Sequence, residues 1–225
     1  GWPAAVRLAV EAMSAMPAGD REQTLRDLVK RPGSQLFAFL AHEVFERQSE
    51  DVQSFIRTVA PLDSFSPELC EELGVARPNE VIDALVQRGL FVRGVGDAFT
   101  LHALVREFAE ATWPLANEER RSILVRAAEW FEAEGRVDSA LSAFAAVSAE
   151  GEVARLLEAR GPELLRSGLA DTALRLAEGL RSELRTAAIQ RLIGDALLER
   201  SDFKGALAAF ERFERRRAFW RRRGS

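Results

Sequence analysis

The sequence has few of the side chains that usually build catalytic and metal sites. It contains one cysteine and two histidines in 225 residues. One cysteine excludes an internal disulfide, and so few donors do not favour a metal cluster or a catalytic triad. A phosphate-binding loop of the form Gly-x-x-x-x-Gly-Lys-Ser/Thr is also absent from the sequence. We therefore expect that the chain by itself is not an enzyme. The single Cys70 falls in a predicted short helix, where a buried core position is favoured over a reactive thiol.

Long apolar runs and a strong excess of one charge are missing as well. We find no run of about 18 apolar residues, so we expect no transmembrane helix. The first residues lack the basic and apolar regions of a signal peptide. A net charge of −4 and a pI near 5.5 give no general reason to expect nucleic acid or a membrane as a partner. With its single cysteine, the chain is predicted to be cytoplasmic. Its start at Gly1 and its abrupt Arg-rich end are those expected of a piece of a longer protein.

The last hundred residues contain an internal repeat. Similar segments occur at 135–144, 168–177 and 201–210, which places Ala140, Ala173 and Ala206 at equivalent positions. The interval is about 33 residues each time, and a sustained period of about 20–50 residues is typical of a solenoid of helix pairs. Each pair would be joined by a turn that begins with glycine or serine, and small alanines would let its two helices approach closely. The predicted core between the helices consists of Leu141, Leu174, Leu207, Phe144 and Phe210. Solenoids present binding surfaces rather than catalytic pockets.

The middle of the chain has a different rhythm. Ser66 and Pro67 predict a helix start, and Gly74 predicts its end. A helix is also predicted from Ser49 to near Pro61. Pro78 and Asn79 start a further short helix over 80–88, and segments 90–93 and 98–101 alternate as a β-hairpin. With the helix predicted over 36–48 and a closing helix over 102–113, this order is that of a winged helix. We therefore predict a mainly α fold with a helical segment at 1–33, a winged-helix domain at 34–115 and helical repeats of the TPR type at 116–225.

The charges of this winged helix oppose the reading of DNA. Residues 34–113 contain 13 acidic and 6 basic side chains, a net charge of −7. The helix that would enter the groove carries Glu80 and Asp83 against Arg88 alone. Phosphate contacts supply most of the nonspecific affinity for DNA, so such a surface should be repelled. The arginines at 215–217 and 221–223 are open to three interpretations: a nucleic-acid patch, a solvated helix end or an appended tail.

Several motifs resemble the signal-transduction ATPases with numerous domains (STAND). Leu101-His102-Ala103 resembles the Met-His-Asp motif that ends the winged helix in that family. Gly1-Trp2-Pro3 resembles the glycine-x-proline motif that begins the helical lid, which places 1–33 as a lid segment. Segment 36–45 is similar to the first winged-helix segment of the maltose-regulon-activator type of large bacterial regulators with a LuxR-type DNA-binding end. The order lid, winged helix, helical repeats is also that of these regulators.

This resemblance implies two site residues and one cofactor. His102 would contact the β-phosphate of ADP and hold a closed, inactive arrangement, and Pro3 would pack near the adenine. The nucleotide, ATP or ADP, would be bound by a nucleotide-binding domain that this sequence lacks. Leu101 replaces the family's methionine, and Ala103 replaces the aspartate together with any hydrogen bond that it makes. Without the resemblance, His102 would be interpreted as a cap or a packed ring, and Pro3 as a helix start.

Three functions remain as hypotheses from the sequence. The first is the regulatory and sensor fragment of a bacterial ATP-dependent transcriptional regulator. In it the winged helix senses the nucleotide state, and the repeats bind a small-molecule inducer or a protein partner. DNA would be contacted only through a domain that is missing here. The second is a protein–protein interaction scaffold built on the repeats. The third is a DNA-binding regulator that uses the winged helix and the arginine-rich end.

Overall fold

The computed structural model of the chain describes residues 48–88 and 92–223. The predicted lid segment, Pro3 and the helix predicted over 36–48 lie outside the described residues. Within them are ten α-helices, one 3-10 helix and a two-stranded sheet. The predicted fold class, mainly α with a small hairpin followed by helical repeats, is confirmed. Contacts divide the chain between Ile123 and Leu124, within one helix, and the two parts are described separately.

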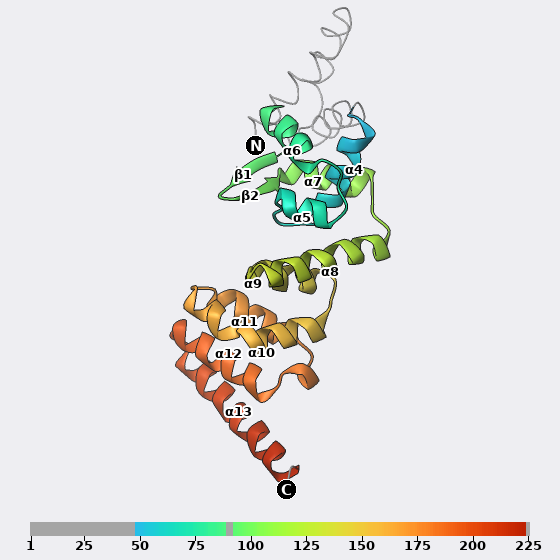
Figure 1. Cartoon of the computed structure of the whole chain (residues 1–225). Coiled ribbons are helices and arrows are strands. Elements are labelled where there is room, and N and C mark those ends of the chain that lie inside the picture. Colours follow the sequence, from blue (N-terminus) through green and yellow to red (C-terminus); the bar gives the residue numbers. More distant parts are fainter. Residues whose placement is uncertain (1–47, 89–91, 224–225) are drawn as a thin grey trace, which may run out of the picture. The chain divides into compact units, whose positions relative to one another are not determined.

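The first part shows the predicted order of short helices, hairpin and closing helix (Figure 1). Its elements are α4 (Glu50–Val59), α5 (Pro67–Glu72), α6 (Pro78–Arg88), β1 (Val92–Val95), β2 (Ala98–Leu101) and α7 (Ala103–Thr112). The two strands are antiparallel, with Val92 opposite Leu101 and Val95 opposite Ala98. Gly96, with φ +59°, lies in the tight turn between them.

Helix α5 begins and ends where the sequence predicts. The Ser66 hydroxyl accepts a hydrogen bond from the Leu69 N–H at 3.3 Å, and Pro67 occupies the first turn. After the helix, Gly74 adopts φ +88°, a left-handed conformation that favours glycine. The N–H of the next residue, Val75, returns to the carbonyl of Cys70 at 2.9 Å. These bonds satisfy backbone groups that a short helix leaves unpaired at its ends.

A third strand-like segment joins the hairpin. Phe65 exchanges two backbone hydrogen bonds with Phe99, at 2.9 and 2.7 Å. Its buried ring stacks on Phe99 and meets Phe55 edge-on, with centroids 6.2 and 5.6 Å apart. Cys70 is fully buried in the same core, which confirms the core interpretation of this thiol. Burial, together with the nearby Glu68 and Glu71, raises the pKa of Cys70 to about 12.

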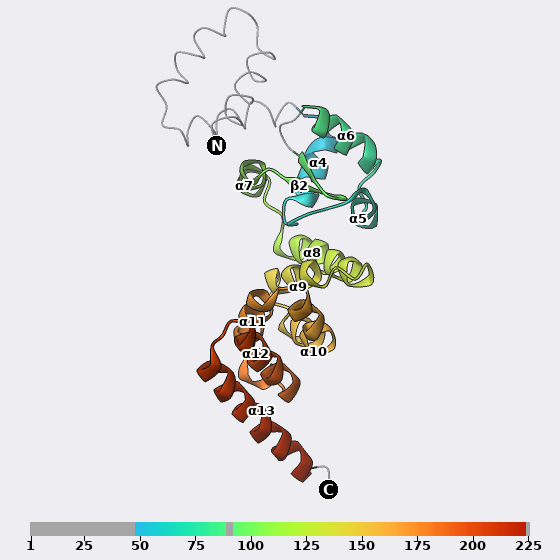
Figure 2. The same cartoon turned by 90° about the vertical axis from the view of Figure 1, so that its left-hand side faces the viewer.

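The second part consists of stacked helix pairs (Figures 1 and 2). The pairs are α8 (Asn117–Ala133) with α9 (Val137–Ala146), α10 (Glu150–Arg166) with α11 (Ala170–Gly179), and α12 (Ala187–Glu199) with α13 (Phe203–Arg223); η1 (Ser182–Leu184) precedes α12. The second helix of one pair packs against the first helix of the next, α9 on α10 and α11 on α12. The first helices α10 and α12 also contact one another.

The turn within each pair has the same conformation three times. Gly135, Gly168 and Ser201 have φ of +72°, +74° and +61°. The N–H of the following residue always returns to a carbonyl near the end of the preceding helix: Arg136 to Phe131 at 2.8 Å, Leu169 to Leu164 at 2.9 Å and Asp202 to Leu197 at 2.9 Å. This is the Schellman motif that ends a helix. The interval of about 33 residues seen in the sequence is thus also the interval at which the same backbone turn recurs.

The predicted core of the pairs is confirmed except at one position. Ala140, Ala173 and Ala206 are 0%, 0% and 1% exposed. Leu141, Leu174 and Phe144 are buried, and Phe210 is half-buried. The prediction for Leu207 is wrong, because its side chain is 62% exposed. Leu141 and Leu174 lie on helices that a following helix covers, whereas no helix of the described part follows α13.

Candidate functional site

His102 lies at the corner between β2 and α7. Its backbone carbonyl accepts hydrogen bonds from the N–H groups of Val105 at 2.8 Å and Arg106 at 3.1 Å. The backbone of His102 therefore closes the first turn of α7, as the residue before a helix ordinarily does. His102 is half-buried.

The environment of His102 favours the neutral imidazole. Burial lowers the pKa of His102 from its ordinary value of 6.5, and the positive charge of Arg93 lowers it further. A neutral imidazole still carries one N–H donor. At pH 7 the side chain can therefore act as a hydrogen-bond donor, and an anion placed against it would favour protonation. Pro3, the other predicted site residue, lies outside the described residues, and its packing near the adenine stays a prediction.

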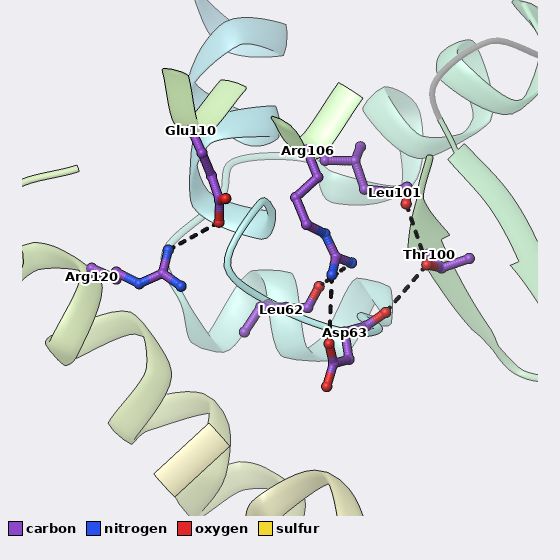
Figure 3. A network of polar contacts seen from close by, with 7 residues as sticks. All are labelled: Leu62, Asp63, Thr100, Leu101, Arg106, Glu110 and Arg120. Carbon is purple, nitrogen blue, oxygen red and sulfur yellow. Dashed lines mark hydrogen bonds and ion pairs between the residues drawn. The ribbon is translucent and has the colours of Figure 1, made fainter. Parts of the chain in front are cut away.

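A polar network fixes this corner of the domain (Figure 3). One terminal nitrogen of Arg106 donates to the Leu62 carbonyl at 2.7 Å, and the other lies 3.5 Å from the Asp63 carboxylate. The Thr100 hydroxyl donates to the Asp63 carbonyl at 3.2 Å. The loop after α4 is thus tied both to β2 and to α7, the two elements that flank His102. The sequence prediction did not assign this role to Arg106.

Two ion pairs hold the first turn of α8 on the winged helix. Arg57 pairs with Glu119 at 3.0 Å, and Arg120 pairs with Glu110 at 3.1 Å (Figure 3 shows the second pair). Beside them is a cavity of about 100 Å³ lined by Arg57, Ala60, Pro61, Ala109, Glu110, Trp113, Pro114, Leu115 and Arg120. Sites for drug-sized ligands measure about 300–1,000 Å³, so this cavity is too small for a nucleotide.

A larger hollow lies on the repeats. It measures about 570 Å³ and is lined mainly by α11 side chains and by Arg200, which follows α12. Arg200 forms an ion pair with Asp171 across it, at 3.2 Å. The lining combines charged side chains with the apolar Leu174, and its size suits a small ligand or a peptide side chain rather than a buried cofactor.

The exposed surface of α5 and α6 is acidic. Five carboxylates on these helices are exposed: Glu68, Glu71, Glu72, Glu80 and Asp83. The hydrogen bond from Ser66 holds the pKa of Glu68 below its usual value, so this carboxylate is ionised at neutral pH. The exposed Arg77 is already paired with Glu80 at 3.2 Å. This face does not offer duplex DNA the phosphate contacts that it needs.

The sequence also contains a second series of small residues at the repeat interval, which the sequence analysis did not predict. Ala128, Gly161 and Gly194 recur at the same interval as the core alanines, on the first helix of each pair. A Cβ added at Gly161 would lie 2.5 Å from a Leu192 methyl, and one at Gly194 would lie 2.5 Å from the Phe210 ring. These glycines therefore let neighbouring helices approach closely. The period that identified Ala140 would have identified them too.

Two kinds of site are not found in the described part of the chain. No group of three or more His, Cys, Asp or Glu side chains there is placed to hold a metal ion. Over the same residues, no helix combines the length and hydrophobicity needed to cross a bilayer.

Comparison with known proteins gives a family match and a similar solved structure. Residues 41–121 match the family described as the MalT winged helix domain. The fold is similar to the crystal structure of a Signal Transduction ATPase with Numerous Domains (STAND) protein with a tetratricopeptide repeat sensor from Pyrococcus horikoshii. The TM-score is 0.62 and the sequence identity 19%, over 93% of this chain and 34% of that chain. The chain thus spans about a third of the length of that protein. A comparison with curated proteins finds no match.

These comparisons agree with a fold in which a winged helix is followed by helical repeats. Within it, residues 41–121 are similar to the MalT winged helix domain. The predicted resemblance of the chain to the MalT-like STAND proteins is confirmed.

Proposed function

We propose that this chain is the regulatory and sensor part of a bacterial ATP-dependent transcription regulator. The observation that carries the proposal is a winged helix of the MalT type followed by helix pairs in one chain. In this proposal the winged helix responds to the nucleotide held by a nucleotide-binding domain, and the repeats bind an inducer or a protein partner. DNA is contacted by another domain, consistent with the acidic surface of α5 and α6.

His102 is the proposed contact to the nucleotide. It lies at a corner fixed by the Arg106 and Thr100 hydrogen bonds, with a half-buried ring. A neutral imidazole N–H donates to a phosphate oxygen, and the negative phosphate raises the pKa of the ring, so the bond becomes charge-assisted. ADP held in this way stabilises a closed arrangement of the parent protein.

Activation is then a shift between closed and open populations. An inducer or partner on the repeats opens the protein only if it binds the open state better. Moving the equilibrium from about 1:99 to about 99:1 needs roughly 10⁴-fold tighter binding to the open state. The inducer must therefore contact surfaces of the repeats that differ between the two states.

The test is a pair of His102 substitutions in the longer protein that carries the nucleotide-binding domain. His102→Ala removes the donor, so ADP affinity should fall about tenfold, in line with one charge-assisted bond, and basal transcription should rise. His102→Gln keeps an N–H donor and should retain part of the affinity. Val95→Ala, at an exposed position of the same hairpin, is the control. Unchanged ADP affinity and basal activity in His102→Ala would remove His102 from the mechanism.

A second candidate is a pure interaction scaffold. The exposed Phe203 and Leu207 of α13 favour it, because large apolar side chains on a surface mark contact sites. A purified partner that binds the 225-residue chain with the same affinity whether or not nucleotide is added would support this function. Binding that requires the nucleotide-binding domain would support the regulator instead.

A further inference from the structure

The hollow on the repeats is bounded by two helix pairs that are both described. It is lined by side chains of α11, among them Leu174, Arg175 and Glu178, and by Arg200, which follows α12. Helix α11 belongs to the second pair and packs against α12 of the third. A further pair would pack against α13, as α10 packs against α9 and α12 against α11. Such a pair would therefore lie against α13 rather than over the hollow on α11.

Two opposite charges in this hollow are left unpaired. Within the described part of the chain, neither the Arg175 guanidinium nor the Glu178 carboxylate takes part in a hydrogen bond or an ion pair. The two residues stand at an i, i+3 spacing, so they lie on the same side of α11 with Cβ atoms about 5–6 Å apart. Arg160 and Glu163, in the same order and at the same spacing on α10, do form an ion pair, at 2.7 Å. The hollow thus presents a cation beside an anion, and each is available to a ligand.

The repeat itself shows that the stacking of helices does not require these charges. In the first pair, the positions equivalent to Arg175, Glu178 and Arg200 are occupied by Ser142, Ala145 and Ser167. Helix α9 packs against α10 there with small, uncharged side chains at all three positions. The three charges around the hollow are therefore an addition to the repeat, made in the second and third pairs.

The arrangement of charges matches an α-amino acid. An arginine guanidinium binds a carboxylate through two parallel N–H bonds, and a carboxylate binds an ammonium group by a charge-assisted hydrogen bond. Asp171 and Arg200 already satisfy one another at 3.2 Å, which leaves Arg175 and Glu178 as the two charges for a ligand. An α-amino acid carries both of its charges on one carbon atom, which suits two side chains that are neighbours on a helix. The buried Leu174 adds an apolar contact for the side chain of such a ligand.

We propose that the hollow on α11 binds a free amino acid with an apolar side chain, whose carboxylate is held by Arg175 and whose ammonium group is held by Glu178. The proposal rests on the sensor role proposed above, and it names the site and the chemical class of the inducer. Arg200 belongs to the third pair, so a ligand in the hollow lies against two pairs at once. Its binding can therefore favour one stacking of these pairs over another.

The experiment is a titration of the isotope-labelled chain with L-leucine, followed by NMR. Resonances of α11 should shift and saturate. Leucine amide lacks the carboxylate and N-acetyl-leucine lacks the ammonium group, so each should bind roughly two- to five-fold more weakly than leucine, as expected for the loss of one exposed ion pair.

Substitutions then assign each charge of the ligand to one side chain. Arg175→Gln should bind leucine and leucine amide equally, because the partner of the carboxylate is gone. Glu178→Gln should bind leucine and N-acetyl-leucine equally. Arg191→Gln is the matched control: this exposed arginine lies on α12 outside the lining of the hollow, and its variant should keep both differences.

Three results would overturn the proposal. The first is the absence of saturable shifts up to about 10 mM leucine, tenfold above a Kd of roughly 1 mM. The second is equal binding of leucine and its two analogues by the unsubstituted chain. The third is a preference for leucine over leucine amide that survives Arg175→Gln. These measurements need no nucleotide and do not involve His102, so failure here removes the site on α11 and leaves the regulatory proposal to its own test.

Discussion

The glycine turn between α10 and α11 offers a clean test of what holds the repeats in register. Gly168 has φ +74°, and a Cβ added there would meet no atom within 4 Å. Gly168→Ala therefore introduces a conformational penalty without a steric one. A left-handed conformation costs an alanine roughly 1–2 kcal/mol. Alanine also lowers the conformational entropy of the unfolded chain, which offsets about 0.4–1 kcal/mol of this penalty. The free energy of unfolding should fall by about 1 kcal/mol, the difference between these two effects.

The equivalent position in the last pair allows the reverse experiment. Ser201 holds φ +61° with a side chain that disfavours it. Ser201→Gly keeps the turn and removes the strain, so the free energy of unfolding should rise by roughly 0.5–1 kcal/mol. The control is Gly151→Ala in the first turn of α10, where a Cβ also meets nothing within 4 Å but the backbone is helical. There alanine should stabilise by up to about 1 kcal/mol.

Urea unfolding followed by circular dichroism in the far ultraviolet measures all three changes. A change of about 1 kcal/mol shifts the midpoint of thermal unfolding by about 4–8 °C in a unit of this size. Alanine should therefore destabilise the chain at Gly168 and stabilise it at Gly151, although neither added Cβ meets another atom within 4 Å. If Gly168→Ala were neutral or stabilising, or if Ser201→Gly were destabilising, the left-handed turn would not be the element that fixes the helix pair.

Three further predictions concern single side chains. Cys70, fully buried and with its pKa raised to about 12, should react with a disulfide reagent at pH 8 at least 100-fold more slowly in the native chain than in urea; fast native labelling would contradict its core position. The midpoint of the His102 titration measured by NMR should lie below pH 6.5, and a midpoint above 6.5 would refute the effect of burial. Because the folded chain binds this proton less readily than the unfolded chain, the free energy of unfolding should fall as the pH drops below 6.5. His102→Gln should abolish that part of the loss. Gly194→Ala should destabilise by about 1 kcal/mol through its contact with Phe210, and a double-mutant cycle with Phe210→Ala should recover that penalty; additive effects would exclude the contact.

The sequence predicts best where the determinants are local. Helix α5 is defined by Ser66, Pro67 and Gly74, which lie close together in the chain, and the structure uses each of them as the pattern indicates. The repeat turns also depend on residues close together in the chain, so the interval seen in the sequence recurs as a positive φ at Gly135, Gly168 and Ser201. Phe65 is different: its partner Phe99 lies far along the chain, beyond α5 and α6, and nothing near Phe65 in the sequence signals the pairing.

Leu207 and His102 show two further limits. Periodicity places Leu207 on the correct side of its helix, but burial requires a neighbouring helix that the pattern cannot supply. For His102, the resemblance gives a candidate role and the sequence gives its place at the start of a helix. The half-buried ring and its lowered pKa depend on packing and on Arg93, which belongs to the other strand of the hairpin. The contacts of Arg106 with Leu62 and Asp63 join segments that are far apart in the chain, so they could not be predicted from the sequence either.

The repeated turn also constrains how such a chain can change its length. The left-handed residue, the small residue of the first helix and the core alanine all advance by the same interval from one pair to the next. Gain or loss of a whole unit leaves each of them in its place. Gain of a single residue within a helix rotates everything beyond it by about 100°, which would turn a buried alanine such as Ala173 toward solvent. Proteins with such repeats should therefore differ in length by whole helix pairs, with shorter insertions confined to the loops between pairs.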